Sequence, residues 1–214
     1  MKFKITFNSP VVLVFTIICL FATILNIATK GVTNDFLFST SHTPLTSFMT
    51  YLRSLTHVFG HADFEHFLGN AAFLLLLGPI LEEKYGGAKL TVVMIITAII
   101  TAVVNYIFFP GTSLCGASGI VFAFILMVSF TNFKQGEIPV TFILVALIYI
   151  GQEVYSGLTV DDNVSNLTHI VGGIVGAIIG YEFGISKPDS VVSSSGVGDD
   201  STTSSSDDDE GLIP

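Results

Sequence analysis

Apolar runs about as long as a lipid bilayer is thick recur along this chain of 214 residues. An α-helix rises about 1.5 Å per residue, so about 20 apolar residues cross the roughly 30 Å hydrocarbon core of a membrane. Backbone polar groups cannot stay unpaired in hydrocarbon, and such runs therefore form helices. Only 12% of the residues are charged, and the mean hydropathy is +0.75. These features predict an all-α polytopic membrane protein.

Six segments of the sequence fit this pattern. They cover residues 10–29, 65–81, 90–109, 117–131, 138–155 and 168–185. The first run has no small-residue cleavage site after it, which favours a retained helix over a signal peptide. The fourth is short, because the 14 residues from Ser118 to Thr131 reach only about 21 Å. We expect a bundle of six transmembrane helices over residues 1–185, with a short central fourth helix.

The distribution of charge predicts the orientation of this domain. With six spans, six of the eight basic residues fall on the side of the two termini, and only Lys30 and Arg53 fall on the other side. Basic residues mark the cytoplasmic side. We therefore expect a multi-pass protein of the plasma (inner cell) membrane with both termini cytoplasmic. The long loop after the first span would lie outside and would shield from lipid the candidate site described below.

The last residues of the chain differ from the rest in composition. Residues 186–214 are rich in Ser and Asp and contain seven acidic residues and one basic residue, which account for −6 of the net charge of −9. Few large apolar residues occur there, so a disordered cytoplasmic tail is predicted. The remainder of the chain is nearly neutral and has no basic patch, which argues against a nucleic-acid partner.

Three polar residues are predicted to lie at one depth in the membrane. Ser118 is 16 residues before Lys134, His169 is 18 before Lys187, and His66 is 16 before Glu82. The three spans run in the same direction, so each residue lies roughly 24–27 Å above the cytoplasmic edge. Ser118, His169 and His66 should therefore lie close together, just below the outer surface.

A serine and a histidine at this depth suggest a nucleophile and its base. A serine hydroxyl needs a general base to take its proton, and histidine has a suitable pKa. Gly116 and Gly119 flank Ser118, and Gly172 follows His169 by three residues. Small residues let two helices approach closely enough for a Ser–His hydrogen bond. A simple helix-packing motif remains the alternative interpretation.

A second polar cluster lies just before and at the start of the second apolar run. His66 and Asn70 are four residues apart and share one helix face, where they could hold the oxyanion of a tetrahedral intermediate with the Ser118 amide. His57 and His61 have the same spacing, which is also compatible with a metal site. Because no cysteine or carboxylate completes a tetrahedral set, we expect neither a metal nor another cofactor.

Together these motifs resemble the rhomboid intramembrane serine proteases of the basic six-helix prokaryotic type, over about residues 10–185. The resemblance rests on a Gly-x-Ser-Gly motif, a histidine followed by spaced glycines, a His-x-x-x-Asn pair with a preceding loop histidine, and a Gly-x-x-x-Glu-x-x-x-Gly pattern. The matching residues are Gly116, Ser118, Gly119, His169, Gly172, Gly176, His66, Asn70, His61, Gly78, Glu82 and Gly86.

The resemblance implies a role for each residue. Ser118 would be the nucleophile and His169 the general base, and His66 and Asn70 would form the oxyanion hole with the Ser118 amide. His61 would be a structural residue of the first loop. Two positions depart from the family pattern. Leu52-Arg53 stands where Trp-Arg is frequent, and Phe122 stands where many members have a tyrosine. Phe122 can stack on the histidine but cannot donate a hydrogen bond.

The function implied is hydrolysis of peptide bonds in or beside the transmembrane segments of substrate proteins within the bilayer. One alternative is a non-proteolytic rhomboid-like protein that binds membrane-protein clients, although such relatives typically lack the serine or the histidine. The other is a small-solute transporter with His66, Asn70 and His169 along its path. The absence of recognisable inverted repeats makes this alternative weaker.

Overall fold

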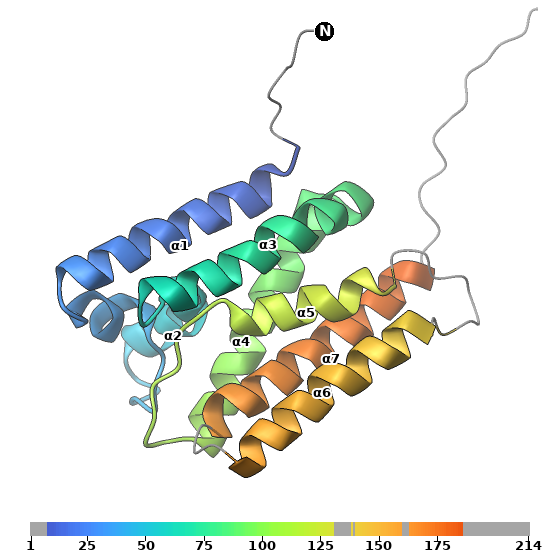
Figure 1. Cartoon of the computed structure of the whole chain (residues 1–214). Helices are drawn as coiled ribbons and strands as arrows, with labels where there is room; N and C mark the ends of the chain where they lie inside the picture. The colour runs from blue at the N-terminus through green and yellow to red at the C-terminus, as the bar shows by residue number, and fades with distance from the viewer. Residues whose placement is uncertain (1–7, 131–137, 139, 160–162, 186–214) are drawn as a thin grey trace, which may run out of the picture.

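The computed structural model describes residues 8–130, 138, 140–159 and 163–185 (Figure 1). The tail predicted at residues 186–214 lies outside this part. Within it the fold is all-α, as predicted, and the only strand-like pairing is an isolated bridge between Thr40 and Leu114. The helices are α1 (Pro10–Ala28), α2 (Phe48–Thr56), α3 (Phe64–Tyr85), α4 (Gly87–Phe108), α5 (Ser118–Val128), α6 (Val140–Thr159) and α7 (Asn163–Ile185).

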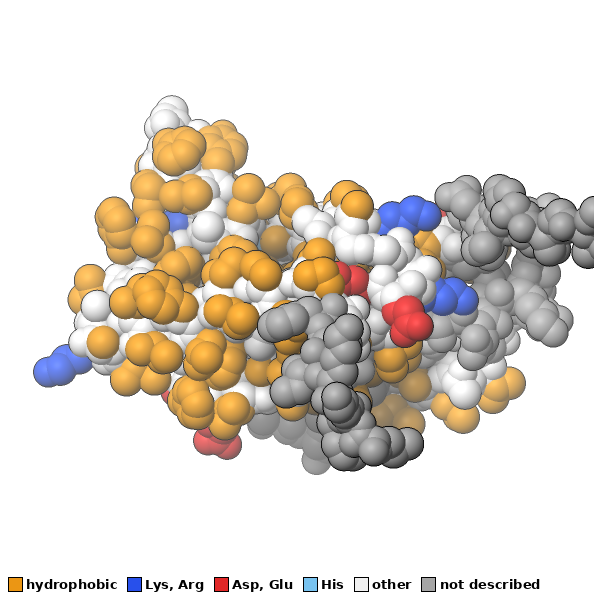
Figure 2. Space-filling model, turned by 90° about the horizontal axis from the view of Figure 1, so that it is seen from above, with side chains coloured by type: hydrophobic (Ala, Val, Ile, Leu, Met, Phe, Trp, Pro, Cys, Tyr) orange, Lys and Arg blue, Asp and Glu red, His pale blue; other side chains and the backbone are white. Residues whose placement is uncertain are grey.

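Three helices in the described part, α1, α3 and α4, are long and apolar enough to cross a membrane. Figure 2 shows apolar side chains spread widely over the described part of one face. Val14, Ile17 and Phe21 of α1, for example, are each more than half exposed. Apolar surface of this extent on a folded chain is expected where lipid is the solvent. The protein is therefore an integral membrane protein, and the count of six spans remains a prediction.

Capping interactions determine where α3 begins and ends. The Asp63 carboxylate accepts a hydrogen bond of 2.8 Å from the backbone N–H of His66, which satisfies one of the unpaired donors of the first turn. Gly86 ends the helix with a φ of +82°, a left-handed conformation that favours glycine. The cap places His66 in the first turn of α3, with Asn70 one turn later.

The start of α1 is attached to the end of α3 by a buried carboxylate. The two Glu82 oxygens accept hydrogen bonds from the N–H groups of Val11 and Val12, at 3.0 and 3.1 Å. Gly78 makes room for this contact, because a Cβ there would lie 2.6 Å from a Val12 methyl group. These contacts place the N-terminus of α1 beside the connection between α3 and α4.

Helix α5 lies between α3 and α7 and also contacts α4 (Figure 1). It has 11 residues, seven of which are buried: Ile120, Val121, Ala123, Phe124, Ile125, Leu126 and Met127. A helix that is apolar on all sides is usually buried in the core of its protein. The surrounding helices thus hold the first turn of α5, which begins with Ser118, in a defined position.

Candidate active site

The entry to α5 is an extended segment whose conformation depends on Gly116. This residue has a φ of +130°, which disfavours any side chain. A Cβ at Gly116 would lie 3.0 Å from Cε1 of His66 and 3.8 Å from Oγ of Ser118. Gly116 therefore allows the His66 ring to approach the first residue of α5. At this helix end the backbone N–H groups of the first turn have no helical partner.

A cavity of about 300 Å³ opens beside Ser118. Its wall brings together five residues that the sequence singles out, from three helices: His66 and Asn70 of α3, Ser118 and Phe122 of α5, and His169 of α7. The rest of the wall is mostly apolar and was not predicted: Gly69, Phe73, Leu114, Cys115, Val121 and Ile125. Gly69 and Phe73 follow His66 at helical spacing, which was the available signal for them.

The His169 ring lies flat against a neighbouring aromatic ring. The centroids of the Phe122 and His169 rings are 4.4 Å apart, and their planes differ by 7°. Phe122 is four residues after Ser118, so both occupy the same face of α5. The stacking restricts the orientation of the His169 imidazole within the cavity that Ser118 also lines. A phenyl ring is sufficient for this contact.

Helices α5 and α7 approach each other closely next to Ser118 and His169. A Cβ at Gly172 would lie 2.9 Å from Cα of Gly119, and one at Gly176 would lie 2.5 Å from Cα of Ala123. Gly119 follows Ser118 directly, and Gly172 lies one turn after His169. The glycine contact predicted from the sequence thus brings the two backbones together at the cavity.

The side-chain amide of Asn70 provides a hydrogen-bond donor that is unused within the described residues. Its side chain is only 7% exposed, and its Nδ2 has no hydrogen-bond partner within the described residues. A buried amide without a partner costs about 1–3 kcal/mol. Since Asn70 lines the cavity together with His66, this donor is available to an oxygen atom bound there.

Cys115 is a second potential nucleophile in the same wall. Burial raises the pKa of its thiol, which keeps the sulfur protonated and unreactive near neutral pH. The Asn34 side chain also approaches the sulfur at 3.9 Å. The hydroxyl of Ser118 is therefore the better nucleophile of the two.

Two buried histidines support the site from outside the cavity. The His61 ring meets the His66 ring edge-on with 5.1 Å between centroids, and its Nδ1 lies 3.2 Å from the Phe59 carbonyl oxygen. His57 was considered only as a metal ligand, but its Nε2 lies 3.3 Å from the Thr101 hydroxyl in a small hollow beside Ser118. Burial lowers the pKa of each histidine to about 4, so both are neutral at pH 7.

Within the part of the chain that the structure describes, no group of three or more His, Cys, Asp and Glu side chains gathers in a way that could hold a metal ion. His57 and His61 each have the separate contacts given above.

The first loop packs against two helices and contacts the segment before α5. It contains a π-helical turn (Asn34–Phe38), α2 and a 3-10 turn (His57–Phe59), which pack against α1 and α4. None of its residues lines the cavity. That the loop shields the cavity from lipid stays a prediction. The loop also holds the segment before α5. Thr40 and Leu114 exchange backbone hydrogen bonds of 2.9 and 2.8 Å, and the His57 carbonyl accepts one of 2.9 Å from Gly116.

Arg53 belongs to this loop and lies outside the cavity wall. Its Nε donates a hydrogen bond of 2.9 Å to the carbonyl oxygen of Phe36. The contact joins α2 to the π-helical turn. Arg53 therefore supports the site through the fold of the first loop and not through direct contact.

Comparison with known proteins identifies relatives of the chain. The family model "Rhomboid domain" matches residues 49–185. Rhomboid-related protein 2 of Mus musculus is 31% identical over 142 residues, which cover 60% of this chain and 47% of that protein. Rhomboid-related protein 1 of Caenorhabditis elegans is 28% identical over 138 residues, covering 60% and 39%. Rhomboid protease GlpG of Haemophilus influenzae is 29% identical over 133 residues, covering 60% and 68%. The chain thus spans half or less of the length of the two rhomboid-related proteins.

Proposed function

Because the chain belongs to the rhomboid family, we propose that it is an intramembrane serine endopeptidase. It would hydrolyse peptide bonds in or beside the transmembrane segments of other membrane proteins. The observation that carries this proposal is that Ser118, His169, His66 and Asn70 line the same cavity. A nucleophile, a base and two oxyanion donors are the groups that acyl transfer requires.

In the proposed reaction His169 takes the proton of the Ser118 hydroxyl as its oxygen attacks the scissile carbonyl. The tetrahedral intermediate collapses, and His169 returns the proton to the departing amine. A water molecule, deprotonated by the same histidine, then hydrolyses the acyl-enzyme and releases Ser118. No Asp or Glu of the described residues lines the cavity, so the catalytic unit is a dyad.

The negative charge of the intermediate would be held by three donors. These are the His66 ring, the unpaired Nδ2 of Asn70 and the backbone N–H of Ser118 at the start of α5. The positive end of the α5 dipole points at the same position. Such donors stabilise the transition state more than the ground state, because the charge appears only during the reaction.

The length of α5 supports access of water to this site. Eleven helical residues measure about 17 Å, much less than the roughly 30 Å of a hydrocarbon core. Ser118 therefore lies below one membrane surface, with a cavity beside it. Lys84 and Lys89 flank the turn between α3 and α4, next to the start of α1. This supports cytoplasmic termini in the plasma membrane and a catalytic cavity nearer the outer surface.

A fluorophosphonate probe tests the proposal directly. We expect covalent labelling at Ser118 in the detergent-solubilised full-length protein, and loss of the label in Ser118→Ala. A soluble serine protease in the same detergent serves as a positive control for the reagent. If that control reacts and Ser118 does not, the non-proteolytic client-binding alternative replaces the protease assignment.

The oxyanion role of Asn70 leads to a separate prediction. Replacing Asn70 by Leu should lower kcat about 10²- to 10³-fold with little change in KM, because the donor acts mainly in the transition state. The measurement is steady-state cleavage of a transmembrane model substrate. Asn166→Leu is the matched control, since Asn166 is also buried with an unpaired Nδ2 but lies outside the cavity. Equal losses in the two variants would refute the role.

A further inference from the structure

Two buried asparagines lie outside the wall of the catalytic cavity. Asn26, near the end of α1, is 5% exposed, and Asn34, the first residue of the π-helical turn, is 6% exposed. Neither takes part in the proposed mechanism. Because a buried amide is costly unless it forms hydrogen bonds, the partners of these two side chains show what they hold in place.

Both side chains donate to the same carbonyl group. The Nδ2 atoms of Asn26 and Asn34 lie 3.1 and 2.9 Å from the carbonyl oxygen of His61, which has two lone pairs and can accept both bonds. The Asn26 Oδ1 in turn accepts a hydrogen bond of 3.3 Å from the Asn34 backbone N–H. These bonds join α1, the π-helical turn and the segment before α3.

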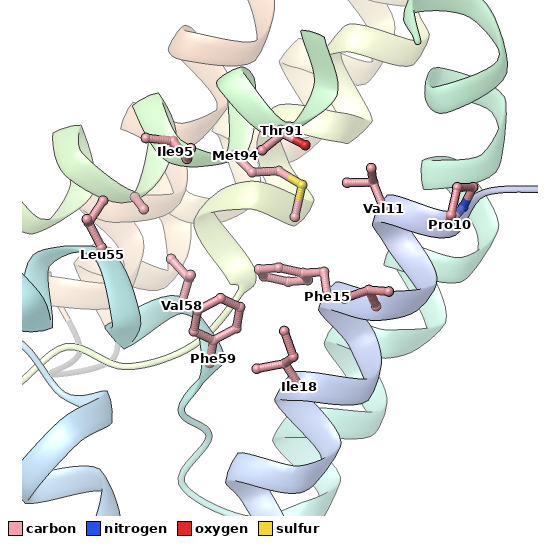
Figure 3. Close-up of a pocket in the computed structure, with 12 residues that line it drawn as sticks. Pro10, Val11, Phe15, Ile18, Leu55, Val58, Phe59, Thr91, Met94 and Ile95 are labelled. Carbon is pink, nitrogen blue, oxygen red and sulfur yellow. The ribbon is translucent and has the colours of Figure 1, made fainter. Parts of the chain in front are cut away.

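The segment that precedes α3 runs beside α1. The Phe59 ring packs against the Phe15 ring with 5.0 Å between centroids, where both rings line an apolar groove of about 580 Å³ (Figure 3). The Cys19 thiol lies 3.8 Å from the Val58 carbonyl oxygen. These contacts hold the segment up to Phe59 against α1, and the two asparagines hold its continuation at His61.

The position of His61 determines the surroundings of His66. The two rings meet edge-on with 5.1 Å between centroids, and Asp63, which caps the first turn of α3 at His66, follows His61 by two residues. On another side, a Cβ at Gly116 would lie only 3.0 Å from the His66 ring. A shift of the His61 backbone would therefore displace this ring, which is one of the three proposed oxyanion donors.

Asn34 has a further contact, with the wall of the catalytic cavity. Its Nδ2 also lies 3.9 Å from the sulfur of Cys115, three residues before Ser118. One amide thus reaches both the segment that leads to His66 and the segment that leads to Ser118. Its Oδ1 has no hydrogen-bond partner within the described residues, which carries a free-energy cost. Such an amide is a poor choice for stability alone.

We propose that Asn34 is a positioning residue of the catalytic cavity, which holds the His61 segment beside the Cys115 segment and so sets the distance of the His66 ring from Ser118. This inference rests on the proposed peptidase function. Asn34 does not line the cavity, so it acts through His66 and not by contact with the substrate. A displaced donor stabilises the developing oxyanion less, and loss of Asn34 therefore affects mainly the transition state.

Asn34→Leu removes the amide and keeps most of its bulk. We expect kcat for a transmembrane model substrate to fall about 10- to 10²-fold, with KM nearly unchanged. In a His66→Ala background the same substitution should lower the residual kcat no further, because the group that Asn34 positions is already absent.

Thr50→Val is the matched control within the first loop. Thr50 is buried, and its hydroxyl donates a hydrogen bond of 2.8 Å to the Pro44 carbonyl oxygen. Its replacement should lower the melting temperature and leave kcat unchanged. The comparison separates a general loss of loop stability from a displaced His66.

Hydrogen exchange of backbone amides in the full-length, detergent-solubilised protein gives a readout that does not need cleavage. Asn34→Leu should raise the exchange rate in peptides that cover His61 to Phe67, and Thr50→Val should not. If Asn34→Leu does not elute as a folded species, Asn34→Ala is measured in its place.

Three results would overturn the proposal: a kcat equal to that of the wild type, a further fall of kcat in the His66→Ala background, or unchanged exchange in Asn34→Leu. If the wild-type protein cleaves nothing, the peptidase assignment fails instead. The exchange measurement then still decides whether Asn34 holds the segment that leads to His66.

Discussion

Ser118→Ala and His169→Ala should each abolish cleavage of a transmembrane substrate while leaving the fold intact. We expect kcat to fall by at least about 10⁴-fold in each variant, because nucleophile and base act as one unit. For the same reason the double variant should be no worse than either single variant. The measurement is cleavage of a model transmembrane substrate in liposomes, with the melting temperature of each variant determined in the same detergent.

Ser129→Ala is a suitable control for the serine variant. Ser129 directly follows α5. Its hydroxyl lies 3.5 Å from the Ile125 carbonyl oxygen, which is a long and weak hydrogen bond. It does not line the cavity, so its loss should leave kcat unchanged. Cleavage that persists in Ser118→Ala or in His169→Ala would remove that residue from the proposed dyad.

Gly172→Ala should destabilise the protein and impair cleavage, although it adds a single methyl group. The new Cβ would lie 2.9 Å from Cα of Gly119, and backbone atoms cannot move aside as a side chain can. Separation of α5 from α7 would also separate Ser118 from His169. We expect a loss of at least about 1–3 kcal/mol, typical of overpacking, and a marked loss of kcat.

Gly173→Ala provides the matched control on the same helix. A Cβ at Gly173 would meet the Leu126 side chain, with the flexible Cδ1 at 3.0 Å and Cγ at 3.8 Å. Alanine also favours the helix by up to about 1 kcal/mol relative to glycine. The melting temperature of Gly173→Ala should therefore stay the same or rise. A similar fall in both variants would show that α7 requires glycine for reasons other than its contact with α5.

The helical regions were predictable because each is encoded locally. An apolar run long enough to cross a bilayer can satisfy its backbone only as a helix, so α1, α3 and α4 lie where the sequence predicts them. The cap at Asp63 is likewise a local interaction, because it joins residues three apart in the sequence. The residues at which the helices end were less predictable. Helix α3 continues through Pro79 to Tyr85, beyond the predicted residue 81.

The main polar residues of the site were also accessible from the sequence. Counting residues from charged membrane edges placed Ser118, His169 and His66 at one depth, and helical spacing added Asn70. All four line one cavity in the structure. Their catalytic roles remain a proposal. The apolar wall and the contact between His57 and Thr101 were not predicted, because nothing in the local pattern distinguishes them from ordinary core residues.

By itself the sequence determined the all-α class, the positions of the main helices and the polar residues that share a depth. It did so because helix formation in a membrane depends on local composition and length. Only the tertiary structure decided that the first loop positions the segment before Ser118. That role depends on hydrogen bonds between Thr40 and Leu114 and between His57 and Gly116, which join residues distant in the sequence. Such pairings follow from how the helices pack, and no local pattern encodes them.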